Sequence, residues 1–272
     1  MKNIIILLFF TSFNLFSSQT HRFIYELNIN KKEDTVNVYM ALDISKNFVK
    51  FYDYEFVKED SIRKKTGENL QYFSDSDQSI IRKTNSFENS SYFSLGYDYF
   101  VIKSTDKVNW KLENETKKIQ NYKLQKAITS FGGREWTAWF TSEIPFQEGP
   151  YKFRGLSGLI FEIYDSEDLF HYTLVKSKNL PKTFETNNFL ETHYGKKSIP
   201  ITLKQYQKVK LDYYNNIIED LDKFRENGGS IASEKEINSK EDIIKQKKEM
   251  QMGIKNYYLP IEKDKAIPYP KD

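Results

Sequence analysis

The sequence predicts an α+β fold that is mostly β: a curved antiparallel β-meander sheet with a C-terminal helix packed against one face. Three observations lead to this prediction. Apolar and polar residues alternate along successive short segments, which is typical of half-buried strands. Turn residues separate these segments at hairpin spacing, so neighbouring strands should run antiparallel. Near the C-terminus, the apolar spacing changes to the period of a helix.

The composition supports one core built largely from aromatic side chains. Of the 272 residues, 19 are Tyr and 21 are Phe, and 39% are hydrophobic, which argues against a disordered chain. The net charge is only +3, with lysines mixed among acidic residues, so charge gives no indication of nucleic-acid binding. Cysteine is absent, which excludes disulfides, thiolate chemistry, Cys metal sites and lipid attachment to a Cys.

The N-terminus has the layout of a secretory signal peptide. Lys2 precedes an apolar run at 4–10, and the small residues Ser17 and Ser18 follow. The run is shorter than the roughly 20 residues that a membrane-spanning helix needs. We therefore expect cleavage near Ser18 or Gln19, which leaves no transmembrane segment in the mature chain. An uncleaved membrane anchor is the alternative.

The first predicted hairpin joins two strictly alternating segments. Residues 23–29 place Phe and Tyr on the same face as Leu and Ile, and residues 36–42 do the same after the polar turn 30–34. An aromatic-rich strand is expected next, over 48–57.

A polar stretch interrupts the strand pattern at 58–92. We expect it to pack loosely on the sheet, with some helix near 68–73. Regular alternation then returns, and Gly132-Gly133 is a turn signal between two strands. The further expected strands cover 97–103, 108–113, 122–131, 135–142, 159–164 and 169–176.

A helix is predicted over about 203–225. Thr202 and Gln205 match a capping box, in which each side chain bonds the backbone N–H of the other residue. Gly228-Gly229 is a suitable helix stop.

The predicted organisation has three parts. Residues 1–18 form the signal peptide, and 19–228 form one β-rich domain that includes the helix. Residues 229–272 form a charged, partly flexible extension with an apolar docking patch at 256–262.

A long central block carries the most distinctive residues. It reads YKLQKA at 122–127 and GGREWTAWFTSEIPFQEGPYKFRGLSGLIFEIYD at 132–165. This block resembles the GLPGLI family of exported bacterial proteins, whose name-giving loop corresponds here to residues 155–160. Ser157 replaces the family's Pro, and Leu124 stands where many relatives carry Cys. The resemblance implies export in a Gram-negative bacterium, to the periplasm or beyond. It implies no established activity, cofactor or catalytic residue.

Two features are candidates for a binding surface. Trp136 and Trp139 lie on opposite faces of one strand, so one should be in the core. The other is either exposed for glycan or peptide contact or covered by a second layer, such as the 203–225 helix. The family-like loop presents its leucines either to a partner or, in the interpretation that we favour, to the core. Its residues are Gly155, Leu156, Ser157, Gly158, Leu159 and Ile160.

No catalytic, cofactor-binding or metal-binding constellation stands out. The loop lacks the last Gly of a nucleophile elbow. Ser157, Asp165 and His171 have the chain order of a hydrolase triad, but no motif supports them. The histidines at 21, 171 and 193 lack the spacing of a helical metal site.

The leading functional hypothesis is a non-enzymatic binding or accessory protein of the cell envelope, with an envelope protein or a small apolar ligand as its partner. The first alternative is a periplasmic carrier or chaperone for a lipid or lipoprotein, held in an apolar cavity between sheet and helix. The second alternative is an exported hydrolase. A ligand-sized cavity would support the carrier, and convergent polar groups would support the enzyme.

Overall fold

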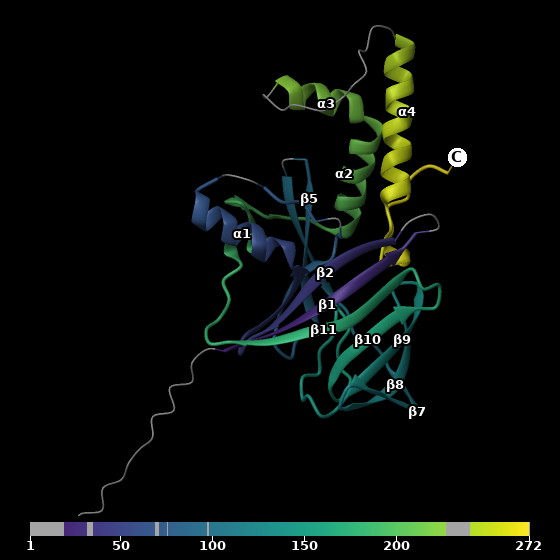
Figure 1. Ribbon diagram of the computed structural model, residues 1–272. Helices are drawn as coiled ribbons and strands as arrows, with labels where there is room; N and C mark the ends of the chain where they lie inside the picture. The colour runs from purple at the N-terminus through teal and green to yellow at the C-terminus, as the bar shows by residue number, and fades with distance from the viewer. Residues whose placement is uncertain are drawn as a thin grey trace, which may run out of the picture.

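The computed structural model (Figure 1) describes residues 19–31, 35–68, 71–74, 76–96, 98–226 and 240–271. The predicted signal peptide at 1–18, the helix stop at Gly228-Gly229 and residues 229–239 of the predicted extension lie outside this part of the chain. Within it the fold is mostly β, with one large curved sheet and helices towards the C-terminus, as predicted.

The first half of the sheet is a run of N-terminal hairpins. Each strand pairs antiparallel with the next one along the chain. These strands are β1 (Thr20–Asn30), β2 (Thr35–Ile44), β3 (Phe48–Asp53), β4 (Ser79–Lys83), β5 (Glu88–Leu95) and β6 (Asp98–Thr105).

The second half is another antiparallel run. It consists of β7 (Lys111–Ile119), β8 (Tyr122–Phe131), β9 (Arg134–Thr141), β10 (Leu159–Asp165) and β11 (Phe170–Leu180). The expected glycine turn is present, because Gly132 and Gly133 separate β8 from β9 and both have positive φ.

The two halves join where β1 pairs antiparallel with β11, which places Leu27 opposite Tyr172. The order across the 12-stranded sheet is β14-β6-β5-β4-β3-β2-β1-β11-β10-β9-β8-β7. The short edge strand β14 (Ile199–Pro200) departs from the all-antiparallel prediction, because it pairs parallel with β6. The chain between β6 and β14 includes the whole second half of the sheet and is long enough for a parallel pairing. It contains the small hairpin of β12 (Thr192–His193) and β13 (Lys196–Lys197).

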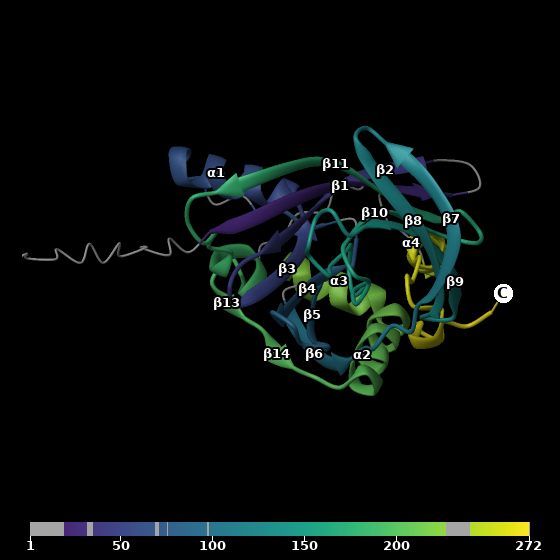
Figure 2. The same cartoon turned by 90° about the horizontal axis from the view of Figure 1, so that it is seen from below.

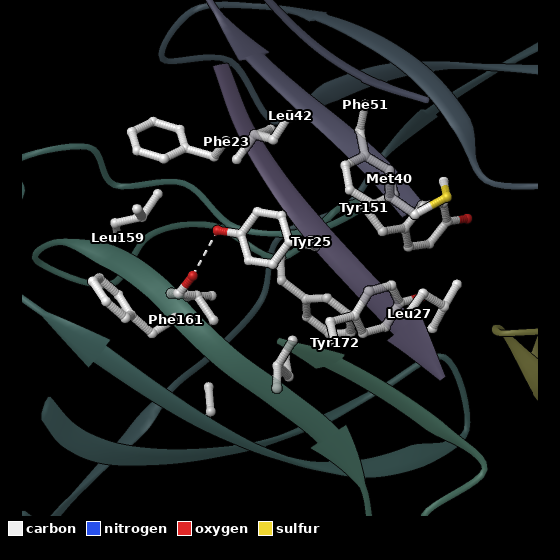
Figure 3. Close-up of a cluster of buried hydrophobic side chains, with 14 of the residues drawn as sticks. Phe23, Tyr25, Leu27, Met40, Leu42, Phe51, Tyr151, Leu159, Phe161 and Tyr172 are labelled. Carbon is white, nitrogen blue, oxygen red and sulfur yellow. Dashed lines mark hydrogen bonds between the residues drawn. The ribbon is translucent and has the colours of Figure 1, made fainter. Parts of the chain in front are cut away.

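The concave face of the sheet carries the main core. Tyr25, Leu27, Met40 and Phe51 project from β1, β2 and β3 into one cluster, which Figure 3 shows. The Tyr25 hydroxyl donates a hydrogen bond of 2.6 Å to the backbone oxygen of Ile160. The segment 142–158, which joins β9 to β10, lies inside the curve of the sheet (Figure 2). It therefore fills the concavity instead of lying at the edge of the sheet.

The convex face has its own smaller core. It is covered by α1 (Glu55–Thr66) and by η1 (Asn187–Glu191), a short π-helix that precedes β12. Phe56 of α1 stacks on Phe189 of η1 with ring centroids 5.4 Å apart, and Phe189 also contacts Tyr52 of β3. This cluster covers the part of the convex side around Ala41 and Tyr52.

The predicted C-terminal helix is present and packs on the sheet. α2 (Leu203–Asn215) begins with the predicted capping box of Thr202 and Gln205. Its Tyr206 contacts Phe93 of β5 and Phe100 of β6. The helix is interrupted at Asn216 and continues as α3 (Ile217–Glu226).

The C-terminal residues return to the sheet. α4 (Lys240–Tyr257) lies beside α2 and has no buried residue. After it, Ile261 enters the main core and Ile267 packs beside α2. Arg134 of β9 donates hydrogen bonds of 3.0 Å to the backbone oxygens of Pro260 and Ile261. The short helix η2 (Lys263–Lys265) completes this contact.

The region after β3 also differs from the sequence prediction. The strand expected over 48–57 ends at Asp53, and α1 begins at Glu55, because the Asp53 carboxylate accepts the backbone N–H of Glu55 and turns the chain. The helix therefore lies before 68–73, and β4 and β5 occupy part of the predicted polar stretch. Only Phe56 and Asp60 of α1 are buried, so its sequence has no amphipathic pattern to detect.

Among the helices in the described ranges, none has both the length and the apolar character that a bilayer crossing requires.

Candidate functional site

The structure places the family-like loop in the core. Leu156 is 3% exposed, and Leu159 and Ile160 are fully buried, whereas Ser157 is exposed. The burial of these side chains favours the structural interpretation of the loop. Gly158 is required for space: a Cβ there would lie 1.8 Å from the backbone oxygen of Thr141.

Charged side chains fix this loop inside the sheet. Glu148 forms ion pairs with Arg82 of β4 and with Arg154 further along the loop, and all three side chains are buried. Arg82 also donates to the backbone oxygen of Tyr151 at 3.1 Å. Because buried charges are tolerated only when they are paired, this cluster holds the loop in one position.

A second buried cluster connects the loop to the C-terminus. Lys152 lies 3.1 Å from Asp106 and 2.7 Å from Glu262. Burial alone would raise the pKa of Asp106, but the charges of Lys152 and Lys265 lower it to about 2. The hydroxyl of Tyr151 donates to Glu262 at 2.6 Å. These groups are committed to one another, so they do not form an open reactive site.

The two tryptophans lie on opposite faces of β9, as predicted. Trp136 is buried on the concave side, where it contacts Phe153 and donates through Nε1 to the backbone oxygen of Phe131. Trp139 points to the other face of β9 but is only 9% exposed and belongs to the same main core cluster. The Lys117 ammonium of β7 lies 4.4 Å from its ring centre, so side chains of the sheet itself, and not the predicted C-terminal helix, cover this tryptophan.

The residues with hydrolase chain order are not brought together. Asp165 pairs with Arg134 at 2.7 Å, and His171 contacts Glu162 at 3.0 Å. Ser157 contacts neither Asp165 nor His171. In the described residues, no group of His, Asp and Glu could hold a metal ion.

A pocket opens on the convex face, between α1, η1 and the strands β4–β6, and we call it the outer pocket. Aromatic rings and serines line it together. The lining residues are Phe56, Phe73, Ser74, Ser76, Asp77, Ser79, Tyr92, Ser94, Tyr99, Phe189 and His193. The pocket is small and partly open, so its interior admits only a small group, and a larger ligand would rest at its mouth.

Several polar groups of the outer pocket are available to a ligand. The side chains of Asp77, Ser79, Tyr92 and Ser94 form no hydrogen bond to any residue within the described ranges. The Nε2 atom of His193 is buried and likewise has no hydrogen-bond partner in that part of the chain. An unpaired buried polar atom costs roughly 1–3 kcal/mol. In the outer pocket, His193 is thus the residue with a buried unpaired polar atom, and the other polar groups lie open to solvent or to a ligand.

The backbone around His193 is unusual. The π-helix η1 ends two residues before it, and such helices occur frequently at functional sites. Tyr194 has φ of 50°, a strained value for a bulky residue. This geometry is held by a hydrogen bond from the Tyr194 backbone to the oxygen of Asn188 at 2.8 Å. Burial, followed by the charge of Lys196, lowers the pKa of His193, so the ring is neutral near pH 7.

The serine-rich wall of the pocket is held to the sheet by hydrogen bonds. Asp53, at the end of β3, accepts hydrogen bonds from Ser74 at 2.7 Å and from Tyr72 at 2.8 Å. The backbone N–H of Tyr72 in turn donates a hydrogen bond to the hydroxyl oxygen of Tyr194. Both walls of the outer pocket are therefore tied to each other and to the sheet.

Comparison with known proteins places the central block in context. A family model described as "Protein of unknown function (Porph_ging)" matches residues 132–162. This match covers β9, the loop inside the sheet and the start of β10, and it leaves out the outer pocket. No curated protein matches the chain.

Solved structures of PNGF-II are similar in fold. One, in space group C2, has a TM-score of 0.51 and 14% sequence identity over 70% of this chain and 32% of PNGF-II. Another, in space group P21, has a TM-score of 0.52 and 15% identity over 71% of this chain and 33% of PNGF-II. The chain thus spans about a third of the length of PNGF-II. At this identity the likeness concerns the fold.

Sequence reasoning missed the outer pocket. Its residues come from two segments, 56–99 and 189–193, that are separated by about 90 positions, so their proximity depends on the path of the chain across the convex face. The one local signal is the run of serines and aspartates at 74–79, which lies within the stretch predicted to be polar and loosely packed.

Proposed function

We propose that this chain is an exported, non-enzymatic binding protein of a Gram-negative cell envelope, and that its ligand occupies the outer pocket. One observation carries the proposal. The outer pocket gathers polar groups that have no partner in the described residues, next to the half-exposed ring of Phe73. The charges of the concave interior, in contrast, are paired with one another.

The alternatives have less support. A lipid carrier needs an apolar cavity between sheet and helix, whereas segment 142–158 fills the concavity and serines line the outer pocket. A hydrolase needs a nucleophile beside a base, and Ser157 and His171 are not in contact. A binding role requires neither feature.

The family likeness supports a shared architecture. Residues 132–162, which the model of unknown function matches, fall within the block that resembles the GLPGLI family. In this structure the block fills and braces the curved sheet. Membership of the GLPGLI family would therefore account for the fold and leave the ligand open.

Export is part of the proposal and can be tested separately. β1 begins at Thr20, directly after the expected cleavage point, so removal of the signal peptide would leave the sheet intact. N-terminal sequencing of protein from the periplasmic or extracellular fraction should give a start near Gln19 or Thr20. An intact Met1 on membrane-bound protein would contradict export as a cleaved form.

Hydrogen exchange with mass spectrometry tests the binding site. The mature protein is incubated in turn with neutral methyl glycosides, a set of tetrapeptides and phosphatidylethanolamine vesicles. At least one probe should slow amide exchange in peptides covering 71–99 and 187–194, and it should be recovered chemically unchanged. Protection confined to other segments, no protection by any probe, or chemical conversion of a bound probe would each contradict the proposal.

A further inference from the structure

Phe73 is the most exposed aromatic ring of the outer pocket. Phe73 is 49% exposed, and its centroid lies 4.9 Å from that of His193. The other rings shield one another: Tyr99 stacks between Tyr92 at 5.7 Å and His193 at 5.4 Å. Phe73 is therefore the ring on which a flat ligand can rest.

Hydroxyl groups lie beside this ring on adjacent strands. Ser79 of β4 stands opposite Tyr92 of β5, and Ser94 lies two residues further along β5 on the same face. A serine hydroxyl both donates and accepts, and the Asp77 carboxylate accepts. The pocket thus offers an apolar face next to several groups suited to hydroxyls.

Other ligand classes fit less well. An anion would meet the carboxylate of Asp77 and a neutral His193. A lipid chain would leave the hydroxyls of Ser79 and Ser94 unpaired, which is unfavourable. A cation bound by aromatic faces needs several open rings, but most rings here face one another.

Building on the proposed function, we infer that the ligand group at the mouth of the outer pocket is the ring of a neutral sugar. One C–H face of the sugar rests on Phe73, and its hydroxyls bond to Ser79, Ser94 and Asp77. A pyranose suits the mouth of the pocket because it combines an apolar face, which can rest on the exposed Phe73, with a rim of groups that both donate and accept hydrogen bonds.

Calorimetric titration of the mature protein tests this inference. The probes are the methyl glycosides of glucose, galactose and mannose, with glycerol and choline as controls that lack the sugar ring. Trisaccharides of the same sugars distinguish two sources of the ligand. If the natural ligand is a polymer, the trisaccharide should bind more tightly than the methyl glycoside, and if it is a free sugar, the two should bind equally. Either result supports a sugar site.

Matched variants locate the binding. Phe73→Ala should weaken the binding of the best glycoside by roughly tenfold, and Ser94→Ala by roughly three- to tenfold. Phe48→Ala is the control, because Phe48 is a similarly exposed phenylalanine, 41% exposed, on β3. It should change the affinity by less than about twofold. Unchanged thermal midpoints of these surface variants would show that folding is retained.

Three results would overturn the sugar assignment: no glycoside binds, choline or glycerol binds as well as the glycosides, or Phe73→Ala and Phe48→Ala weaken binding equally. If tetrapeptides, but no glycoside, protect the pocket from hydrogen exchange, the sugar assignment fails while the proposed binding function stands. If no probe protects the pocket, both fail.

Discussion

At Gly158 the chain passes so close to the end of β9 that a methyl group has no room. The obstructing atom is the backbone oxygen of Thr141, at 1.8 Å from the position of a Cβ, and it cannot move aside as a side chain could. Gly155 differs, since its φ is 99° but nothing lies within 4 Å of its Cβ position. The two glycines are thus needed for different reasons, namely space at Gly158 and backbone conformation at Gly155.

Substituting alanine at Gly155 and at Gly158 should distinguish backbone strain from steric clash. Gly155→Ala should lower the free energy of unfolding by about 1–2 kcal/mol through backbone strain. Gly158→Ala should lower it by roughly 3 kcal/mol or more, because the strand ends must move apart. Urea unfolding of both variants measures the difference. Equal losses would mean that the loop relaxes around residue 158.

Leu156 and Ser157 are neighbours with opposite exposure. Leu156→Asp should destabilise the protein by roughly 4 kcal/mol or more, because it removes a buried side chain and buries a charge. Ser157→Asp adds the same charge at an exposed position and should cost less than about 0.5 kcal/mol. A Leu156→Asp variant that unfolds at the wild-type urea concentration would restore the loop as a candidate binding surface.

At the scale of the elements, β10 and β11 are joined by a pair of titrating side chains, Glu162 on β10 and His171 on β11. The hydrogen bond to Glu162 raises the pKa of His171 above 6.5, and the same bond lowers the pKa of Glu162 below 4.5. The histidine contribution to stability is present below pH 6.5 and is lost as pH rises through the folded-state pKa. The glutamate contribution is present above pH 4.5 and is lost as pH falls.

Stability measured across pH should reveal this pair. The difference in unfolding free energy between wild type and His171→Gln should be largest between about pH 4.5 and 6.5 and should shrink by pH 8. His21→Gln is the control, since the ring of His21 bonds the amide of Asn179 instead of a carboxylate. A difference for His171→Gln that is constant from pH 4.5 to 8 would contradict the coupling.

The C-terminal segment shows how unequally one stretch of chain contributes to the fold. Ile261 is 7% exposed in the main core, whereas Ile244 on α4 is 57% exposed. Ile261→Ala should therefore cost about 2–4 kcal/mol, and Ile244→Ala less than about 0.5 kcal/mol. Thermal unfolding of the two variants gives the comparison. Similar midpoints would show that the segment after α4 is not part of the core.

For the molecule as a whole, the sequence predicted the features that depend on local pattern. The alternation in β1 and β2, the Gly132-Gly133 turn and the Thr202 capping box all act over a few residues, and all are present. The prediction was wrong for α1 because that helix buries only Phe56 and Asp60. Parallel β14 was not predicted, since its pairing with β6 depends on a long connection.

The candidate site was less accessible to sequence reasoning than the fold. The alternation in β9 predicted that one of Trp136 and Trp139 is in the core without deciding which, and burial of Leu156 was the favoured of two interpretations. The outer pocket combines Phe73 with His193, and only the path of segment 181–198 over the convex face brings these rings together. Unpaired polar atoms are likewise visible only after every neighbour has been placed.

The central claim is that ligand binding depends on the outer pocket and folding depends on the loop inside the sheet. The most direct test is the free energy of unfolding with and without the best-binding methyl glycoside, for wild type and Phe73→Ala. At a hundred times its Kd, the glycoside should add about 2.7 kcal/mol to the wild type. Without ligand, Phe73→Ala should have the same free energy of unfolding as the wild type. With the glycoside, its free energy of unfolding should increase clearly less than that of the wild type. Equal gains in both proteins, or no gain in the wild type with any glycoside, would contradict the claim.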